Sequence, residues 1–91
     1  MGADTDESLH VMMGRAFDEA SKAAAKYGDF ASMHEGYGVL AEEVAELFDA
    51  VRMKYETGQS KSTRSAAIEA AALQVAAVAL RIAEQARRVT R

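Results

Sequence analysis

Residues 34–47 have the sequence HEGYGVLAEEVAEL, which places four carboxylates in a segment whose apolar residues recur at helical spacing. Carboxylates beside a buried apolar surface commonly hold a cation, because an unpaired buried charge is costly. Glu43 and Glu46 lie one helical turn apart and offer hard oxygen ligands to the same Mg²⁺ ion. The stretch therefore predicts an amphipathic helix that carries a candidate magnesium site.

The flanking residues set the bounds of this helix at about 33–57. Ser32 is a favourable N-cap residue, and Glu35 three positions later completes a capping box. Turn-forming residues at 58–62 end the helical pattern. The predicted core stripe of this helix consists of Met33, Tyr37, Leu40, Val44, Leu47, Val51 and Tyr55.

Two further helices are predicted, one on each side of this segment. The first covers about 6–27 and ends at Gly28, with residues 1–6 expected to be disordered. The third covers about 63–89 and is apolar on two sides, along one stripe that contains Ile68 and a second that contains Leu73. Because the chain has only two other helices, the second apolar side is expected to meet another subunit.

The predicted fold is a single all-α domain over residues 1–91, a three-helix antiparallel bundle completed by oligomerisation to a homodimer or homotetramer. A chain of 91 residues with 49% hydrophobic content can build only a modest core by itself. The chain has no cysteine, which excludes disulfides, thiolate zinc sites and a cysteine nucleophile. A cysteine-free sequence also fits a reducing compartment, so we expect a cytoplasmic protein.

The net charge and the hydropathy of the chain limit the classes of molecule that it is expected to bind. The formal net charge is −3, whereas binding to nucleic-acid phosphates needs a clustered basic surface. The chain has no uninterrupted run of about 18 apolar residues, and its first residues are acidic, so neither a membrane span nor a signal peptide is indicated. We therefore expect neither nucleic acid nor a membrane as a partner.

Helical geometry separates Glu43 and Glu46 from the other acids. Relative to the centre of the core stripe, Glu43 lies about 60° away and Glu46 about 120° away, on the same side. A half-buried carboxylate needs a cation, a hydrogen-bond donor or a raised pKa. The alternative is a solvated face in which the acids pair with Arg52 and Lys54, and spacing alone favours that alternative.

The same segment resembles the first signature of a known family. EEVAEL at 42–47, preceded by HEGYGVL at 34–40, is similar to the Glu-Glu-x-x-Glu helix of the all-α, MazG-like nucleoside triphosphate pyrophosphohydrolases, relatives of the dimeric dUTPases. QVAAVALR at 74–81 resembles the segment that carries the family's second signature, Glu-x-x-Asp. The resemblance covers about residues 30–86.

The second signature departs from the family pattern. Gln74 stands where the family has Asp, and Ala71, which cannot bind metal, stands at the Glu position. Glu69 is a poor substitute, because it projects about 140° away from Gln74 around the helix. The metal site therefore uses only acids of the 33–57 helix and water, or the register differs, or catalysis is weakened or lost.

The resemblance implies hydrolysis of a nucleoside triphosphate, more specifically a deoxynucleoside triphosphate, to the monophosphate and pyrophosphate. By the family match Glu43 and Glu46 would ligate Mg²⁺, and Glu42 would act as a ligand or as the base, so that Glu42 and Glu43 are the catalytic candidates. Magnesium would neutralise phosphate charge and activate a water, which a carboxylate orients or deprotonates.

Five other polar residues are candidates for substrate binding. Gln74 and Arg81 share one band of the 63–89 helix, and Arg81 could grip a triphosphate or, as an alternative, reach solvent or pair with an acid of the 33–57 helix. His34, Glu35 and Tyr37 lie at the start of the 33–57 helix, where amide dipoles and rings suit a phosphate or a base. Tyr37 also continues the core stripe, and His34 fits an exposed helix start equally well.

Two functions of different classes follow. The first is a Mg²⁺-dependent nucleotide pyrophosphohydrolase, indicated by Glu43, Glu46 and the family resemblance. The second is a non-catalytic helical oligomer, either a degenerate relative that binds nucleotide or an interaction module, indicated by Ala71 and the two-sided apolar helix.

Overall fold

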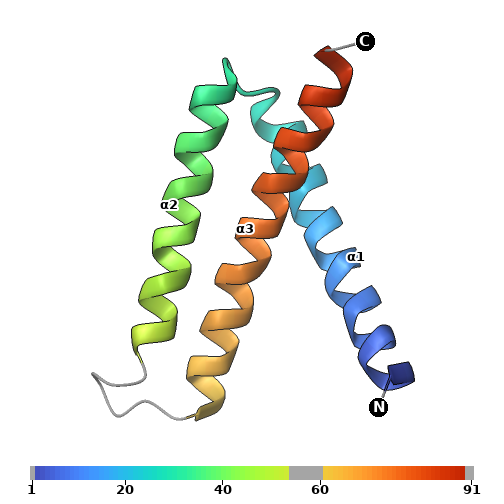
Figure 1. Ribbon diagram of the computed structural model, residues 1–91, viewed down its shortest axis with the longest axis vertical. Helices are drawn as coiled ribbons and strands as arrows, with labels where there is room; N and C mark the ends of the chain where they lie inside the picture. Colours follow the sequence, from blue (N-terminus) through green and yellow to red (C-terminus); the bar gives the residue numbers. More distant parts are fainter. Residues whose placement is uncertain (1, 54–60, 90–91) are drawn as a thin grey trace.

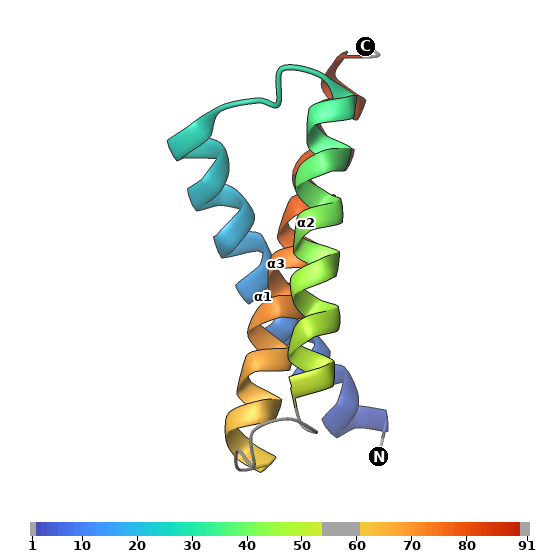
Figure 2. The same ribbon diagram turned by 90° about the vertical axis from the view of Figure 1, so that its left-hand side faces the viewer.

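The computed structural model describes residues 2–53 and 61–89, which form three helices: α1 (Gly2–Tyr27), α2 (Met33–Arg52) and α3 (Lys61–Val89). α3 is the central helix, with α2 antiparallel along one side of it and α1 on the other (Figure 1). Within the described ranges α1 and α2 do not pack against each other. α1 crosses α3 obliquely, as the view at 90° shows (Figure 2). The prediction of an all-α fold with three helices packed together is confirmed.

The starts of α1 and α3 differ from the sequence prediction, and α3 begins at Lys61 rather than at about residue 63. α1 begins at Gly2, so residues 2–6, for which disorder was expected, are helical. Acidic side chains such as Asp4 in the first turn favour this start, because they complement the positive end of the helix dipole. α2 ends at Arg52, and most of its predicted extension to residue 57 lies outside the described residues.

Local hydrogen bonds fix the connection between α1 and α2. Gly28 has a φ of +72°, and its N–H donates to the carbonyl of Ala24 (2.9 Å), which ends α1. Ser32 is the N-cap of α2, and its hydroxyl accepts from the N–H of Glu35 (3.1 Å). In a complete capping box the Glu35 carboxylate would accept from the N–H of the N-cap residue, Ser32. Here it accepts instead from the N–H of Ala31, one residue earlier (2.7 Å).

α3 holds this connection through its C-terminal half. The buried Gln85 amide makes two hydrogen bonds of 2.9 Å to Phe30, donating to its carbonyl and accepting from its N–H. The Arg81 guanidinium donates to the Gly28 carbonyl (3.1 Å) and lies over the Phe30 ring, 4.3 Å from its centroid. Arg88 pairs with Asp29 at 2.7 Å. These contacts secure the turn that positions α1 relative to α2.

α2 packs on α3 through small residues. Gly36 and Ala50 are its buried positions. A Cβ added at Gly36 would lie 3.1 Å from Cδ2 of Phe30 and 3.2 Å from Cγ1 of Ile82, so the absence of a side chain allows the close approach. The predicted core stripe is wrong for Met33, Tyr37, Val44 and Val51, which are exposed, whereas Leu40 and Leu47 are half-buried and Tyr55 lies outside the described residues.

The core of the single chain is small. Its buried hydrophobic residues are Ala16, Ala20, Phe30, Ala50, Ala77 and Val78, and among the described residues no large side chain is fully buried. The radius of gyration is 15.1 Å, whereas a compact domain of this length has about 12 Å. The three helices therefore form an open bundle, a layer in which α1 and α2 both pack on α3 but not on each other.

By length and composition α3 is also apolar enough to cross a membrane, and little of its apolar window is buried in the single chain. Glu69, Gln74 and Arg81 interrupt the apolar sequence of α3. The criterion of about 18 consecutive apolar residues therefore does not identify α3 as a possible membrane span. Each of these three polar side chains has a hydrogen-bond partner on α1 or on the connection after it. These contacts join α3 to α1 and to the connection that follows α1.

Candidate functional site

A groove of about 580 Å³ lies between α1 and α2, with α3 as its floor. We call it the polar groove, and its main side chains are Glu19, Lys22 and Lys26 of α1, Glu35 and Glu43 of α2, and Gln74 and Arg81 of α3, with Tyr27 and Phe30 at the connection. Its volume lies within the range of about 300–1,000 Å³ typical of small-molecule sites. The groove thus combines charges of both signs with two aromatic rings.

Glu43 is a half-buried carboxylate of this groove, as is Glu19. Burial raises the pKa of Glu43 above its ordinary value, and the neighbouring carboxylates of Glu46 and Glu42 raise it further. No hydrogen bond or ion pair of Glu43 is found within residues 2–53 and 61–89. This arrangement suits a group that accepts a proton or meets a positively charged ligand.

Three cations lie in the same groove. Lys22 and Lys26 come from α1 at a spacing of four residues, so both lie on one side of that helix. Arg81 comes from α3 and uses one N–H for the Gly28 carbonyl, while a guanidinium offers five N–H donors in total. The polar groove can therefore offer positive charge from two helices to an anionic ligand.

The sequence-predicted site residues divide into three groups. Glu35, Glu43, Gln74 and Arg81 meet in the polar groove. Glu46 lines a neighbouring shallow depression, which it shares with Asp49, Ala71 and Gln74. Glu42, His34 and Tyr37 are exposed and do not line the polar groove.

The described residues do not fit a resident metal site. They contain no group of three His, Cys, Asp or Glu side chains placed to hold a metal ion. Glu43 and Glu46 come from one helix, and Ala71 supplies no ligand from α3. Magnesium is commonly held by one or two carboxylates together with substrate phosphates and water. An ion that arrives with a nucleotide is therefore compatible with these side chains, whereas a permanently bound ion is not.

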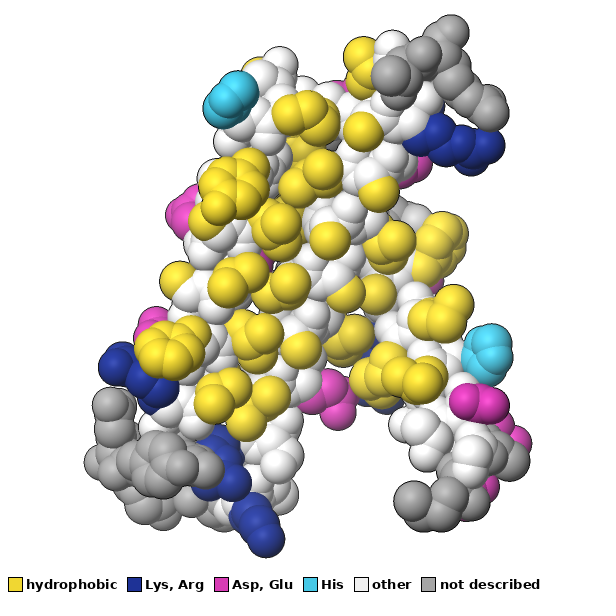
Figure 3. Space-filling model, in the orientation of Figure 1, with side chains coloured by type: hydrophobic (Ala, Val, Ile, Leu, Met, Phe, Trp, Pro, Cys, Tyr) yellow, Lys and Arg dark blue, Asp and Glu magenta, His cyan; other side chains and the backbone are white. Residues whose placement is uncertain are grey.

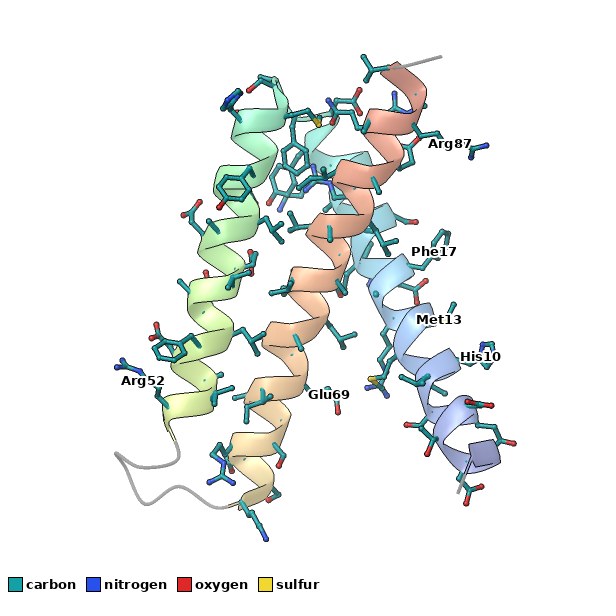
Figure 4. The ribbon with its side chains drawn as sticks, in the orientation of Figure 1. His10, Met13, Phe17, Arg52, Glu69 and Arg87 are labelled. Atoms are coloured by element: carbon teal, nitrogen blue, oxygen red, sulfur yellow. The ribbon has the colours of Figure 1, made fainter. Side chains whose placement is uncertain are left out.

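The alternative of a solvated, salt-bridged acidic face is found in part on the described part of α2, because Glu42, Glu46 and Asp49 are exposed and one of them has a basic partner. Arg52 pairs with Asp49 at 3.5 Å and lies over the Phe48 ring, and it points away from α3 (Figure 4). Within the described ranges Glu42, Glu43 and Glu46 form no ion pair. Lys54, the other cation of that alternative, lies outside the described residues.

Glu69 is not a replacement ligand. Its carboxylate pairs with Arg15 of α1 at 2.7 Å, on the side of α3 turned away from α2 (Figure 4). Gln74 also has its partner on α1, because its amide donates to Glu19 at 3.2 Å.

The α1 side of the groove was missed by sequence reasoning. Glu19, Lys22 and Lys26 recur at spacings of three and four residues, which places them on one helical face, away from the apolar residues Leu9 and Met13. That pattern was available in the sequence. It gave no reason, however, to expect this face beside Glu43, because the crossing of α1 over α3 is a tertiary property.

Comparisons of this chain with protein-family models, with curated proteins and with solved structures found no match.

Proposed function

We propose that this chain hydrolyses a nucleoside triphosphate, bound in the polar groove together with Mg²⁺, to the monophosphate and pyrophosphate. The observation that carries the proposal is the position of Glu43, a half-buried carboxylate with a raised pKa that shares one groove with Lys22, Lys26 and Arg81. A triphosphate needs positive charge, and hydrolysis needs a group that takes a proton from water. The groove offers both.

Each side chain would have a defined task in this reaction. Lys22 and Lys26 would meet the phosphates, and the Tyr27 ring would offer a surface on which a base can stack. Glu43 would orient the water that attacks the α-phosphate and accept its proton, because a carboxylate with a raised pKa is a better base near neutral pH. Glu46 and Glu42 would add negative charge at the edge of the site, toward the cation that accompanies the nucleotide.

Magnesium would enter with the nucleotide and reduce the negative charge of the phosphates. The nucleotide would supply most of its ligands, because the described residues offer two carboxylates of one helix rather than a complete ligand set. Separately from the hydrolytic activity, we propose that the chain associates with itself, because the core of one chain is small for an independently stable protein.

The test is pyrophosphate release from each common ribo- and deoxyribonucleoside triphosphate in the presence of Mg²⁺. We expect release with at least one substrate, and Glu43→Gln should lower kcat by about 100-fold or more, since general-base catalysis contributes about 10²–10⁴-fold. Glu7→Gln, at an exposed position of α1 outside the groove, is the matched control and should retain the wild-type rate. A wild type inactive on the whole panel, or full activity in Glu43→Gln, would show that the assignment is wrong.

A second candidate function is nucleotide binding without hydrolysis. It is favoured by the missing third ligand, since Ala71 and Gln74 face the depression lined by Glu46. Thermal unfolding with Mg²⁺ and with each nucleotide separates the two functions. A ligand that binds the native state raises Tm by mass action. A rise in Tm without pyrophosphate release would support binding alone, and no rise with any nucleotide would contradict both functions.

A further inference from the structure

Hydrophobic side chains gather over all three helices on one face of the molecule (Figure 3). We define this apolar face by Leu9, Met13 and Phe17 of α1, Val44 and Phe48 of α2, and Leu80 of α3, each between 46% and 64% exposed. Isolated exposed apolar residues are ordinary, but a continuous face of large ones marks a surface that is covered in the working protein.

The exposed area is larger than a single chain of this size should leave. The accessible surface is 6662 Å² for 9.8 kDa, whereas a folded monomer of that mass exposes about 5,200 Å². The excess of about 1,500 Å² per chain, doubled over two chains, falls within the 2,000–5,000 Å² that obligate homodimers bury. The excess accessible surface of two chains therefore matches the area that a permanent homodimer interface buries.

The face contains a groove as well as exposed large side chains. An apolar groove of about 670 Å³ lies between α1 and α3, with alanines such as Ala76, Ala79 and Ala83 on its α3 side. This is several times the cavity of about 150 Å³ that holds a benzene molecule, so it can accept several large side chains. Val44 and Phe48 of α2 in the same chain are exposed and do not line this groove.

We propose that the apolar face binds a second copy of this chain, with the α2 ridge at Val44 and Phe48 of each copy seated in the α1–α3 groove of the other. A two-fold axis makes this contact twice, once for each copy. Helical geometry places Phe48 and Val44 opposite Glu46 on α2, so this pairing leaves the polar groove open. The inference therefore holds or fails independently of the hydrolytic activity.

The first test is the mass in solution, by light scattering after size exclusion. The wild type should have twice the chain mass of 9.8 kDa. Phe48→Glu and Phe17→Glu should each raise the dissociation constant by about 100-fold or more, because each buries a charge in an apolar contact. Val11→Glu is the matched control, since Val11 is exposed to a similar degree on the side of α1 turned away from α3, and it should remain dimeric.

The second test does not depend on the glutamate variants folding. Because the chain has no cysteine, Phe48→Cys and Phe17→Cys can be mixed and treated with a short bis-maleimide. The proposal expects cross-linked dimers from the mixture and none when Val11→Cys replaces Phe17→Cys. A monomeric wild type, or a monomer that floats with phosphatidylcholine vesicles, would overturn the proposal, as would equal cross-linking through Val11→Cys.

Discussion

At the scale of single residues, Gln85 of α3 stabilises the connection between α1 and α2. Its buried amide satisfies both backbone groups of Phe30, in the connection that sets α1 against α2. Gln85→Leu would leave one N–H and one carbonyl without partners, each costing about 1–3 kcal/mol. We expect the free energy of unfolding to fall by about 2–4 kcal/mol, measured by urea denaturation. Glu84→Gln, at the adjacent exposed position, should change it by less than about 1 kcal/mol, and an equal loss in both variants would contradict the role of Gln85.

Glu43 should make the free energy of unfolding fall as pH rises, whereas a salt-bridged acid would make it rise. Burial raises its pKa above the ordinary 4.5, and Glu46 and Glu42 add to this effect. Because the folded chain then holds this proton more tightly than the unfolded chain, the contribution of Glu43 to the free energy of unfolding falls as pH rises from about 4.5 through the raised folded-state pKa.

Glu43→Gln should therefore be more stable than the wild type near pH 7.5, by less than about 1 kcal/mol because the side chain is partly exposed. The difference should vanish near pH 4, where the carboxyl is protonated in both states. Urea unfolding at both pH values measures it. A variant less stable than the wild type at pH 7.5 would show that the ionised carboxylate stabilises the fold. Gain of stability together with loss of pyrophosphate release would mark Glu43 as a functional residue that the fold holds at a cost.

At the scale of the elements, the packing of α2 on α3 rests on a missing side chain. A Cβ at Gly36 would press on Phe30 and Ile82, whereas a Cβ at Gly38 has no atom within 4 Å outside its own helix. Gly38→Ala should stabilise the protein by about 0.5–1 kcal/mol through helix propensity. Gly36→Ala should lose about 1 kcal/mol, because an overpacking cost of about 1–3 kcal/mol exceeds the same gain. Urea midpoints of the pair measure the difference, and equal stabilisation by both would mean that α2 can move away from α3.

The same helix shows what hydrophobic periodicity can and cannot predict. The number of helices, the cap at Ser32 and the end of α1 at Gly28 follow from local chemistry, and the sequence predicts each of them. The side of α2 that packs on α3 was predicted only in part: Leu40 and Leu47 are half-buried there, whereas Gly36 and Ala50 contribute almost no hydrophobicity to a periodic pattern. The stripe that the pattern does mark, with Tyr37 and Val44, is largely the exposed one. Periodicity identifies an apolar side without identifying which chain covers it.

The residues of the candidate site were likewise predicted in part. Glu43, Gln74 and Arg81 were found because a sequence motif and a shared helical face single them out, and they do meet in one groove. Lys22 and Lys26 were not found, since their relation to Glu43 depends on how α1 crosses α3. Local spacing predicts which side chains share a helix face, and only the packing of helices decides which faces meet.

At the scale of the whole molecule, α3 joins two surfaces of opposite character. One side of the helical layer carries the polar groove, and the other carries the apolar face. α3 supplies Gln74 and Arg81 to the first and Leu80 to the second, which explains why it is apolar nearly all round yet interrupted by polar residues. If the apolar face is covered by a second copy, the partner adds the burial of large side chains that the chain's own small core lacks.

Unfolding should then be coupled to dissociation, and Tm should rise with chain concentration. For two chains of 91 residues, with an unfolding enthalpy of about 0.7 kcal/mol per residue, a 100-fold increase in concentration should raise Tm by about 5–8 °C. Circular dichroism from about 1 to 100 µM covers this range. Phe48→Glu should lower Tm and remove its concentration dependence, while Val11→Glu should keep the wild-type slope. A wild-type Tm that is constant over this range would mean that the open layer of three helices is stable alone, and that the small core is sufficient.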